Sequence, residues 1–404
     1  MGLLIEGKEM QGVKDGRCHY CMNEEKELFH QFYHHGFEKE VSYCRSCIRM
    51  TYSSTETFYD LLELPPVYEE ADYQLDFELT DQQQYASRAI VETVIEGGRK
   101  LLHAVTGAGK TEMILEGIKV ARQRGQNVAL VSPRVDVVKE LYLRMNEYFR
   151  TDIDVLYQGQ TLQFNSTFVI STVQQLVKYQ NHFGLVIVDE VDAFPLPMDK
   201  RLRQTLERAA TKDAALVYLT ATPSKELQRE MKEVTVVLPA RYHRRPLPVP
   251  SYKYLSKRQL MKGGLSPYLK RQPATYLLVF FNNISDMAQA ADVYRDFQPV
   301  TVYAADALRH EKVEAIRAGQ HAIIFTTTIL ERGFTMANLD VYVIGAESYT
   351  AECLVQMAGR VDRKFIPYEG TVRFFHDGVS REMQAAVQEI RKMNIDAKKR
   401  GWID

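Results

Sequence analysis

Long apolar runs, surplus charge and cysteine are all scarce in this chain of 404 residues. No apolar run approaches the roughly 20 residues that a membrane-spanning helix needs, so we expect membrane contact only through a partner. A formal net charge of −1 excludes a polycationic coat for nucleic acid, and any such site must come from local groups of positive charge. With five cysteines and no secretory signal, we expect no disulfides and a cytoplasmic location, with peripheral attachment at the inner face of the membrane left open.

Four of the five cysteines form two C-x-x-C pairs near the amino terminus, Cys18 with Cys21 and Cys44 with Cys47. Four thiolates in this arrangement are typical of tetrahedral zinc, and one extra turn absorbs the slightly long gap between the pairs. A redox pair is the alternative, but the βαβ surroundings of redox motifs are absent. We predict a closed structural Zn²⁺ site on these four residues, in a module too small to fold without the metal.

The role of this module is open between binding a partner protein and binding nucleic acid. His19, His30, His34 and His35 are nearby spare ligands, and two or three of them are expected to be solvated or to stand beside the ligands rather than to bind the metal. The fifth cysteine, Cys353, lies on the apolar side of an expected helix and is predicted to be a buried core thiol.

A glycine-rich turn lies between an apolar run at 101–105 and an amphipathic run from Thr111 to about Arg124. Backbone N–H groups of such a turn converge on an anion, Lys110 can reach the β- and γ-phosphates of a nucleotide, and the Thr111 hydroxyl can hold Mg²⁺. The usual first glycine is replaced by Ala104, and an ordinary glycine turn is the alternative. The residues predicted to bind ATP here are Thr106, Gly107, Ala108, Gly109, Lys110 and Thr111.

Acidic residues follow a second buried strand. The apolar run 184–188 ends in Asp189-Glu190-Val191-Asp192, where open α/β sheets bind their ligands. Asp189 can hold Mg²⁺ together with Thr111, and Glu190 is placed to orient or deprotonate the attacking water. The alternative is that these acidic residues form an ordinary solvated loop. The phosphate-type loop earlier in the chain argues against that alternative.

These segments and several later ones resemble the motifs of the superfamily 2 helicases, in the expected order between about residues 79 and 375. The matching segments are 79–83 (glutamine motif), 104–112 (motif I), 132–134 (Ia), 170–172 (Ib), 189–192 (II), 220–222 (III), 280–283 (like IV), 326–333 (V) and 356–363 (VI). The resemblance implies a nucleic-acid-stimulated ATPase of helicase or translocase type, with ATP and Mg²⁺ as cofactors.

Individual roles are implied by the same resemblance. Gln83 would recognise adenine, with Gln82 and Gln84 as rivals, and Gly333 would contact the nucleotide. The residues implied to contact nucleic acid are Arg134, Thr172, Asn282 and Thr327.

Two arginines of the motif VI segment, Arg360 and Arg363, are three apart on an expected helix and would share a face. Hydrolysis of ATP spreads negative charge over the γ-phosphate oxygens, and an arginine placed there raises the rate by several powers of ten. Because these arginines lie far from Lys110 in the sequence, we expect them in another domain, so that hydrolysis depends on domain closure. Surface ion pairs are the alternative.

Alternating strands and helices predict an α/β protein with two RecA-like parallel-sheet lobes and a small N-terminal four-cysteine zinc module. The expected strands lie near 101–105, 128–132, 167–171, 185–189, 215–219, 234–238, 275–281, 299–303, 321–326, 340–344 and 370–375. The expected domains are a zinc-binding module and linker at 1–64, ATP-binding lobe 1 at 65–240, a proline-marked hinge at 241–272 and lobe 2 at 273–404.

A four-cysteine module ahead of two such lobes, the segment from Asp189 to Pro195 and a short chain without large insertions are similar to the ComFA family of late-competence DNA-uptake ATPases. That resemblance implies an ATPase stimulated by single-stranded DNA, which acts as a translocase and helps to draw DNA through a membrane channel during natural transformation. It also implies partners from the competence machinery, among them ComFC and a DNA-processing protein. An oligomer is left open.

Other functions remain open at this point. A replication-restart helicase similar to PriA shares the helicase motifs but normally carries its cysteines between later elements. A non-catalytic adaptor that binds zinc and nucleotide would have lost the motif II acids or the motif VI arginines, and all are present. An RNA helicase is less favoured, because Asp189-Glu190-Val191-Asp192 departs from the Asp-Glu-Ala-Asp of that group. Basic groups at 241–245, 253–262, 270–271 and 398–400 are expected to be solvated faces rather than nucleic-acid sites.

Overall fold

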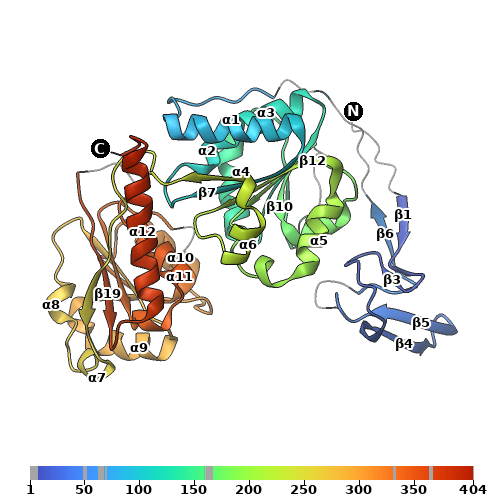
Figure 1. Cartoon of the computed structure of the whole chain (residues 1–404). Coiled ribbons are helices and arrows are strands. Elements are labelled where there is room, and N and C mark those ends of the chain that lie inside the picture. The colour runs from blue at the N-terminus through green and yellow to red at the C-terminus, as the bar shows by residue number, and fades with distance from the viewer. Residues whose placement is uncertain are drawn as a thin grey trace. The chain divides into compact units, whose positions relative to one another are not determined.

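The computed structural model describes residues 8–48, 52–61, 68, 71–158, 160, 167–330, 334–363 and 367–403. The chain forms two compact units, which are drawn in Figure 1. The first unit contains residues 1–103 and 110–237, and the second contains residues 104–109 and 238–404. Within the described ranges, no helix is both long and apolar enough to span a bilayer.

The amino-terminal part of the first unit is a set of short antiparallel pairs. Strand β1 (Lys8–Gln11) pairs with β6 (Phe58–Leu61), β2 (Val13–Lys14) with β3 (Arg17–Cys18), and β4 (Phe29–His34) with β5 (Lys39–Cys44). A short 3₁₀ turn, η1 (Lys26–Leu28), leads into β4. Cys18 ends β3 and Cys44 ends β5, so two strand ends deliver the first cysteine of each pair.

The rest of the first unit is built on a seven-stranded sheet in the order β13-β7-β12-β11-β8-β10-β9. Its strands are β7 (Gly98–Ala104), β8 (Asn127–Ser132), β9 (Asp154–Leu156), β10 (Phe168–Thr172), β11 (Phe183–Asp189), β12 (Ala210–Thr220) and β13 (Thr235–Leu238). The pairs from β7 to β9 are parallel, and β8 is buried along its whole length, as expected of a strand covered on both faces.

Helices cover this sheet, and α1 and α3 lie side by side (Figure 1). The helices are α1 (Asp81–Glu96), α2 (Lys110–Met113), α3 (Leu115–Gln123), α4 (Val135–Tyr148), α5 (Lys200–Ala209) and α6 (Lys225–Glu230), with 3₁₀ turns η2 (Val173–Lys178), η3 (Leu196–Met198) and η4 (Lys232–Val234). Helix α1 begins with a capping box in which Thr80 and Gln83 satisfy each other's backbone N–H groups.

The second unit has a six-stranded parallel sheet in the order β14-β19-β18-β15-β17-β16. Its strands are β14 (Ser251–Tyr254), β15 (Tyr276–Phe280), β16 (Val300–Val302), β17 (Ile323–Thr326), β18 (Leu339–Ile344) and β19 (Val372–His376). Its helices are α7 (Lys257–Leu260), α8 (Ser266–Leu269), α9 (Ile284–Val293), α10 (Arg309–Arg317), α11 (Ala351–Ala358) and α12 (Arg381–Lys399), with 3₁₀ turns η5 (Arg295–Phe297), η6 (Thr328–Leu330) and η7 (Ala346–Ser348).

The apolar runs of the sequence become the central strands of both sheets, and the predicted α/β fold with two parallel sheets is confirmed. Within these two sheets, β9 and β14 were not predicted, and neither were the short strands β1 to β6 of the amino-terminal part. All four residues of β14 are exposed, so this edge strand lacks the alternation of buried and exposed residues by which a strand is predicted. It lies inside the segment 241–272, which was expected to be a hinge. The proline-rich stretch before it is tied to α12, where the Asn394 side chain donates to the Leu247 carbonyl (2.9 Å) and accepts from the Leu247 N–H (2.7 Å).

Candidate functional site

The glycine-rich turn joins the end of β7 to the start of α2 at Lys110. Gly107 and Gly109 have φ angles of 81° and 80°, in the left-handed region that residues with a Cβ rarely adopt, which explains the glycines at these two positions. Thr106 and Ala108 are buried beside them, and Thr111 Oγ1 accepts from Arg144 Nη1 at 3.5 Å. The backbone of this turn is therefore shaped as a phosphate-binding loop requires.

The acidic segment follows β11, which lies beside β12, and β12 lies beside β7. Because the carboxyl ends of parallel strands meet at one edge, Asp189 and Lys110 lie at the same edge of the sheet. Burial raises the pKa of Asp189, and the nearby positive charge of Lys110 opposes that rise. A carboxylate that is costly to ionise without a cation beside it is suited to hold Mg²⁺.

Glu190 has an unusual backbone. Its φ is 54°, in a region that costs a residue with a side chain free energy, and its N–H donates to Asp189 Oδ1 at 2.9 Å. The Asp189 carboxylate is thus held by the backbone of the residue that is expected to orient the attacking water.

Asp192 has a role that the sequence did not suggest. Its Oδ1 accepts from the Thr220 hydroxyl at 2.5 Å and its Oδ2 accepts from the Thr222 hydroxyl at 2.7 Å. Thr220 ends β12, and its Oγ1 also accepts from the Thr222 N–H at 3.0 Å. One carboxylate therefore joins the motif II segment to the motif III segment at the edge where Asp189 lies.

The motif VI arginines lie after a helix rather than on it, so their predicted shared helical face is wrong. Helix α11 ends at Ala358 with Gly359 as its C-cap, and Arg360 and Arg363 follow in a turn. The turn nevertheless brings both together, because Arg360 Nη1 donates to the Phe334 carbonyl at 2.7 Å and Arg363 Nη1 reaches the same oxygen at 3.5 Å. Arg363 also donates to Thr335 Oγ1 at 3.0 Å.

Arg241, expected to be a solvated basic residue, is one of the most buried side chains of the second unit. Its Nε donates to the Thr106 carbonyl at 3.1 Å, and its Nη1 donates to the carbonyls of Val361 and Asp362 at 2.7 and 2.8 Å. Burial lowers the pKa of Arg241 to about 10. Arg241 thus stabilises the motif VI turn from inside by donating to backbone carbonyls, and it is not a nucleic-acid contact.

Gln83, the residue expected to recognise adenine, forms part of the capping box at the start of α1. Gln83 is buried, and its Oε1 accepts from the Thr80 N–H and hydroxyl, both at 3.0 Å. Of its two rivals, Gln82 is buried and Gln84 donates to the Leu79 carbonyl at 2.8 Å. Adenine recognition by Gln83 remains a prediction.

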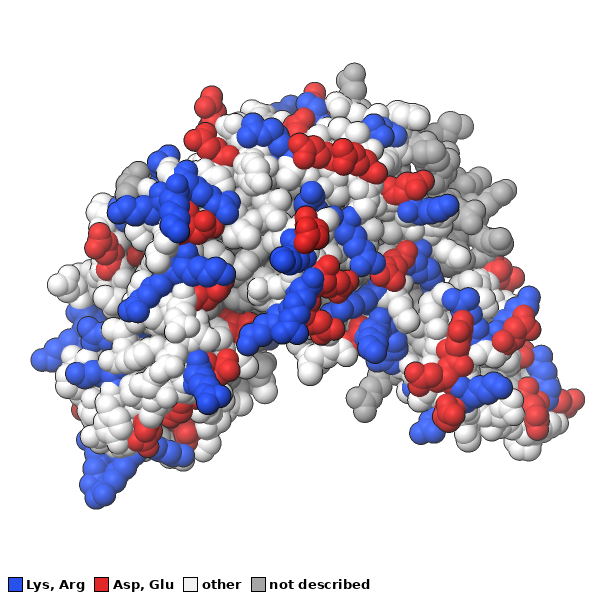
Figure 2. Space-filling model, in the orientation of Figure 1, with Lys and Arg blue, Asp and Glu red and all other residues white. Residues whose placement is uncertain are grey.

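The four residues expected to contact nucleic acid differ in exposure. Arg134 is paired with Asp136 through two hydrogen bonds of 3.1 and 2.6 Å, and Thr172 is buried at the end of β10. Asn282 is exposed after β15, and Thr327 is partly buried after β17. Gly333 lies outside the described residues. Figure 2 shows basic and acidic side chains interspersed over the face in view, so charge of one sign marks no strand-binding surface there.

The four cysteines of the two pairs form one buried cluster. Their sulfur atoms all lie within 4.8 Å of one another, with Cys18 and Cys47 at 3.8 Å and Cys21 and Cys44 at 3.6 Å. Zn–S bonds of about 2.3 Å place the sulfurs of a tetrahedron about 3.8 Å apart, so the cluster fits Zn²⁺. Among the described residues, this cluster contains the four cysteines and no histidine. Cys353 is only partly buried, so the prediction of a core thiol there is wrong.

Hydrogen bonds among the thiols shape their ionisation. The bond to Cys21 lowers the pKa of Cys18, and the bond to Cys18 raises the pKa of both Cys21 and Cys47. A metal that binds all four sulfurs as thiolates must displace the protons that remain on them.

Three segments of the chain match known families. Residues 4–60 match the competence protein ComFA N-terminal domain, residues 76–225 match the type III restriction enzyme res subunit, and residues 258–364 match the helicase conserved C-terminal domain. The fold is similar to that of Saccharomyces cerevisiae Dbp5 bound to RNA and ADP BeF3, with a TM-score of 0.56, 13% identity and coverage of 79% of this chain and 92% of Dbp5. The two lobes are therefore RecA-like, and the chain is an ATPase of helicase type.

Whole-chain similarity is greater to two bacterial proteins. Competence protein ComFA of Bacillus subtilis is 36% identical over 397 residues, which cover 94% of this chain and 85% of that protein. Competence protein ComFA of Streptococcus pneumoniae is 35% identical over 378 residues, which cover 88% of this chain and 86% of that protein. Since both relatives are more than 30% identical over most of the chain and of their own length, the chain belongs to the ComFA family of competence proteins.

Proposed function

We propose that this helicase-like motor hydrolyses ATP to move along single-stranded DNA and so assists DNA uptake during natural transformation. The observation that carries the proposal is the Asp192 carboxylate, which holds Thr220 and Thr222 at the sheet edge where Lys110 and Asp189 lie. Such a link lets a change at the nucleotide alter the segment that follows β12. A protein that binds nucleotide only as a structural ligand would not need a link between the motif II and motif III segments.

In this proposal Lys110 neutralises the β- and γ-phosphates, Thr111 and Asp189 hold Mg²⁺, and Glu190 orients the attacking water. Arg360 and Arg363 stabilise the charge that develops on the γ-phosphate. Gln83 and Gly333 complete the nucleotide contacts. The proposed domain limits are 1–64, 65–240, 241–272 and 273–404.

Strand contact is assigned to Arg134, Thr172, Asn282 and Thr327, acting on the sugar–phosphate backbone and therefore without sequence preference. Because the Thr172 side chain is buried, its contact would come from the main chain at the end of β10. ComFC and a DNA-processing protein are the proposed partners, and the proposed place of action is the cytoplasmic face of the membrane channel.

The test is steady-state ATP hydrolysis without nucleic acid, with single-stranded DNA, with duplex DNA and with single-stranded RNA. Glu190→Gln serves as the blank, and Glu207→Gln, an exposed residue of α5, is the matched control. Stimulation by single-stranded DNA above all other additions is expected. Stimulation mainly by forked duplex would favour a PriA-like helicase, stimulation mainly by RNA would favour an RNA helicase, and a rate equal to the blank throughout would favour an adaptor.

A further inference from the structure

Helix α5 presents two arginines to the four-cysteine cluster. Arg201 and Arg208 are seven residues apart, hence on one face of the helix, and each contacts a different cysteine pair. Arg201 Nη1 donates to the Ser46 carbonyl and, at 3.0 Å, to the Ser46 hydroxyl, between Cys44 and Cys47. Arg208 Nη1 donates to the His19 carbonyl and, at 3.3 Å, to the Tyr20 carbonyl, between Cys18 and Cys21.

Both arginines are also hydrogen-bonded to residues of the ATPase lobe. Arg201 is clamped by the N-cap residue Asp199, whose two carboxylate oxygens accept from Nε and Nη2 at 2.8 Å each. Arg208 donates from Nη2 to the Val177 carbonyl and from Nε to the Tyr179 carbonyl at 3.4 Å. In each guanidinium, Nε and Nη2 therefore donate to residues of the ATPase lobe, and Nη1 donates to the backbone between the two cysteines of a pair.

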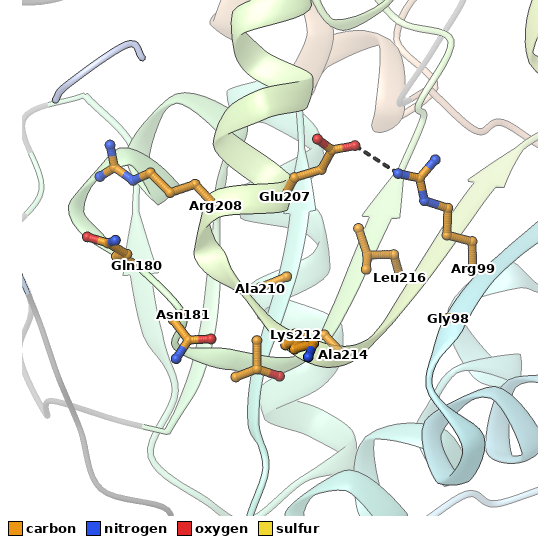
Figure 3. A pocket seen from close by; sticks show the side chains of 11 residues that line it. Gly98, Arg99, Gln180, Asn181, Glu207, Arg208, Ala210, Lys212, Ala214 and Leu216 are labelled. Atoms are coloured by element: carbon orange, nitrogen blue, oxygen red, sulfur yellow. Dashed lines mark hydrogen bonds and ion pairs between the residues drawn. The ribbon is translucent and has the colours of Figure 1, made fainter. Parts of the chain in front are cut away.

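Figure 3 shows how α5 separates its charges. Glu207 points to Arg99 and forms an ion pair with it at 2.8 Å, and both residues line a pocket of about 510 Å³. The neighbouring Arg208 points away from Glu207, on the side of Gln180. Arg203 on the same helix approaches Glu230 at 4.0 Å. Arg201 and Arg208 thus face the cysteine pairs, whereas Arg203 faces Glu230.

The contacts have an electrostatic consequence. Zn²⁺ bound by four thiolates carries two net negative charges, and two guanidinium groups supply two positive charges beside it. The carbonyl of Ser46 shares a planar peptide unit with the N–H of Cys47, and the carbonyl of Tyr20 shares one with the N–H of Cys21. A cation on the carbonyl polarises that unit and increases the partial positive charge on the cysteine N–H.

We propose that Arg201 and Arg208 form a cationic clamp that holds the zinc tetrathiolate on α5, so that retention of Zn²⁺ depends on the ATPase lobe. They are positioning residues, since they act on the metal through the peptide units of the cysteine pairs. The clamp gives the four-cysteine module a fixed partner inside its own chain, on a helix that begins shortly after the motif II segment. This inference rests on Zn²⁺ being the bound metal, but not on the translocase activity.

The experiment uses the full chain and begins with its zinc content, for which one equivalent is expected. Zinc release to pyridylazoresorcinol is then timed for wild type, Arg201→Gln, Arg208→Gln and the double variant, with Arg203→Gln as the matched control. Second-layer partners of metal ligands are worth about 10–100-fold in affinity, so we expect release about 10-fold faster in each single variant and faster again in the double variant. Arg203→Gln should release zinc at the wild-type rate.

A lysine pair keeps the test decisive if the glutamine variants fold poorly. Arg201→Lys with Arg208→Lys retains both charges but loses the two-sided geometry, so its release rate should fall between those of wild type and the double glutamine variant. Wild-type release rates in the double glutamine variant would overturn the clamp, as would equal acceleration by Arg203→Gln. A wild-type chain without zinc would overturn it at the first step, whatever its ATPase rate.

Discussion

At the scale of single residues, Asp192 is the side chain through which the motif II and motif III segments are joined. Replacement by Asn keeps the shape but leaves only one good acceptor for the two threonine hydroxyls. Hydrogen bonds to a charged group are worth about 1.5–3 kcal/mol, so Asp192→Asn should lower the DNA-stimulated ATPase rate by about 10- to 100-fold. The exposed Asp213→Asn on β12, the strand that ends at Thr220, should leave the rate unchanged, and an unaffected Asp192→Asn would show that the link carries no coupling.

A second residue-scale prediction concerns acid. Burial lowers the pKa of His182 to about 4, and its Nε2 lies 3.3 Å from Asn127 Nδ2 between β11 and β8. The folded state keeps the ring neutral while the unfolded chain takes up a proton near pH 6.5, so stability falls as the pH drops from about 6.5 toward 4. At pH 5 the loss is about 2 kcal/mol.

The measurement is the urea dependence of amide exchange in β8 and β11 at pH 7 and pH 5. His182→Gln cannot take up the proton and should lose about 2 kcal/mol less than wild type between the two values. The exposed His310→Gln should behave as wild type. An identical acid loss in His182→Gln would place the titrating group elsewhere.

At the scale of elements, α1 depends on its first turn. The capping box of Thr80 and Gln83 satisfies two backbone donors, and Thr80→Ala should lower the free energy of unfolding of this helix by about 1 kcal/mol. Amide exchange over α1 in urea measures this. Glu92→Ala on the exposed face of the same helix is the control and should change it little.

The sequence predicted those elements whose residues carry a periodic or continuous apolar signal. Strands such as β8 and β18 are buried throughout and were predicted, whereas the exposed edge strand β14 has no such pattern and was interpreted as part of the hinge. The helix expected to carry Arg360 stops at Gly359, a residue that commonly ends helices. Side chains that bind distant backbone carbonyls, such as Arg241, Arg201 and Arg208, leave no spacing signal, because any residue can supply a carbonyl.

At the scale of the whole molecule, the four-cysteine cluster and the ATPase lobe belong to one unit. Cys44→Ser should lower the zinc content from one equivalent to none and reduce the thermal stability of the first unit, since metal binding stabilises such small modules by roughly 10–16 kcal/mol. Zinc analysis and a thermal scan measure the two effects. Cys353→Ser, outside the cluster, should retain its zinc, and a Cys44→Ser chain that still holds one equivalent would refute the assigned ligands.

The contacts from α5 to the cysteine pairs also set an order of events during synthesis. Arg201 and Arg208 meet carbonyls of residues that lie 155 and 189 positions earlier in the chain. At about 5–20 residues per second, the ribosome delivers these arginines about 10–40 s after the cysteines. If the proposed clamp holds, the newborn module must keep its Zn²⁺ for that interval without the two arginines, so the metal is least protected while the chain is still being made.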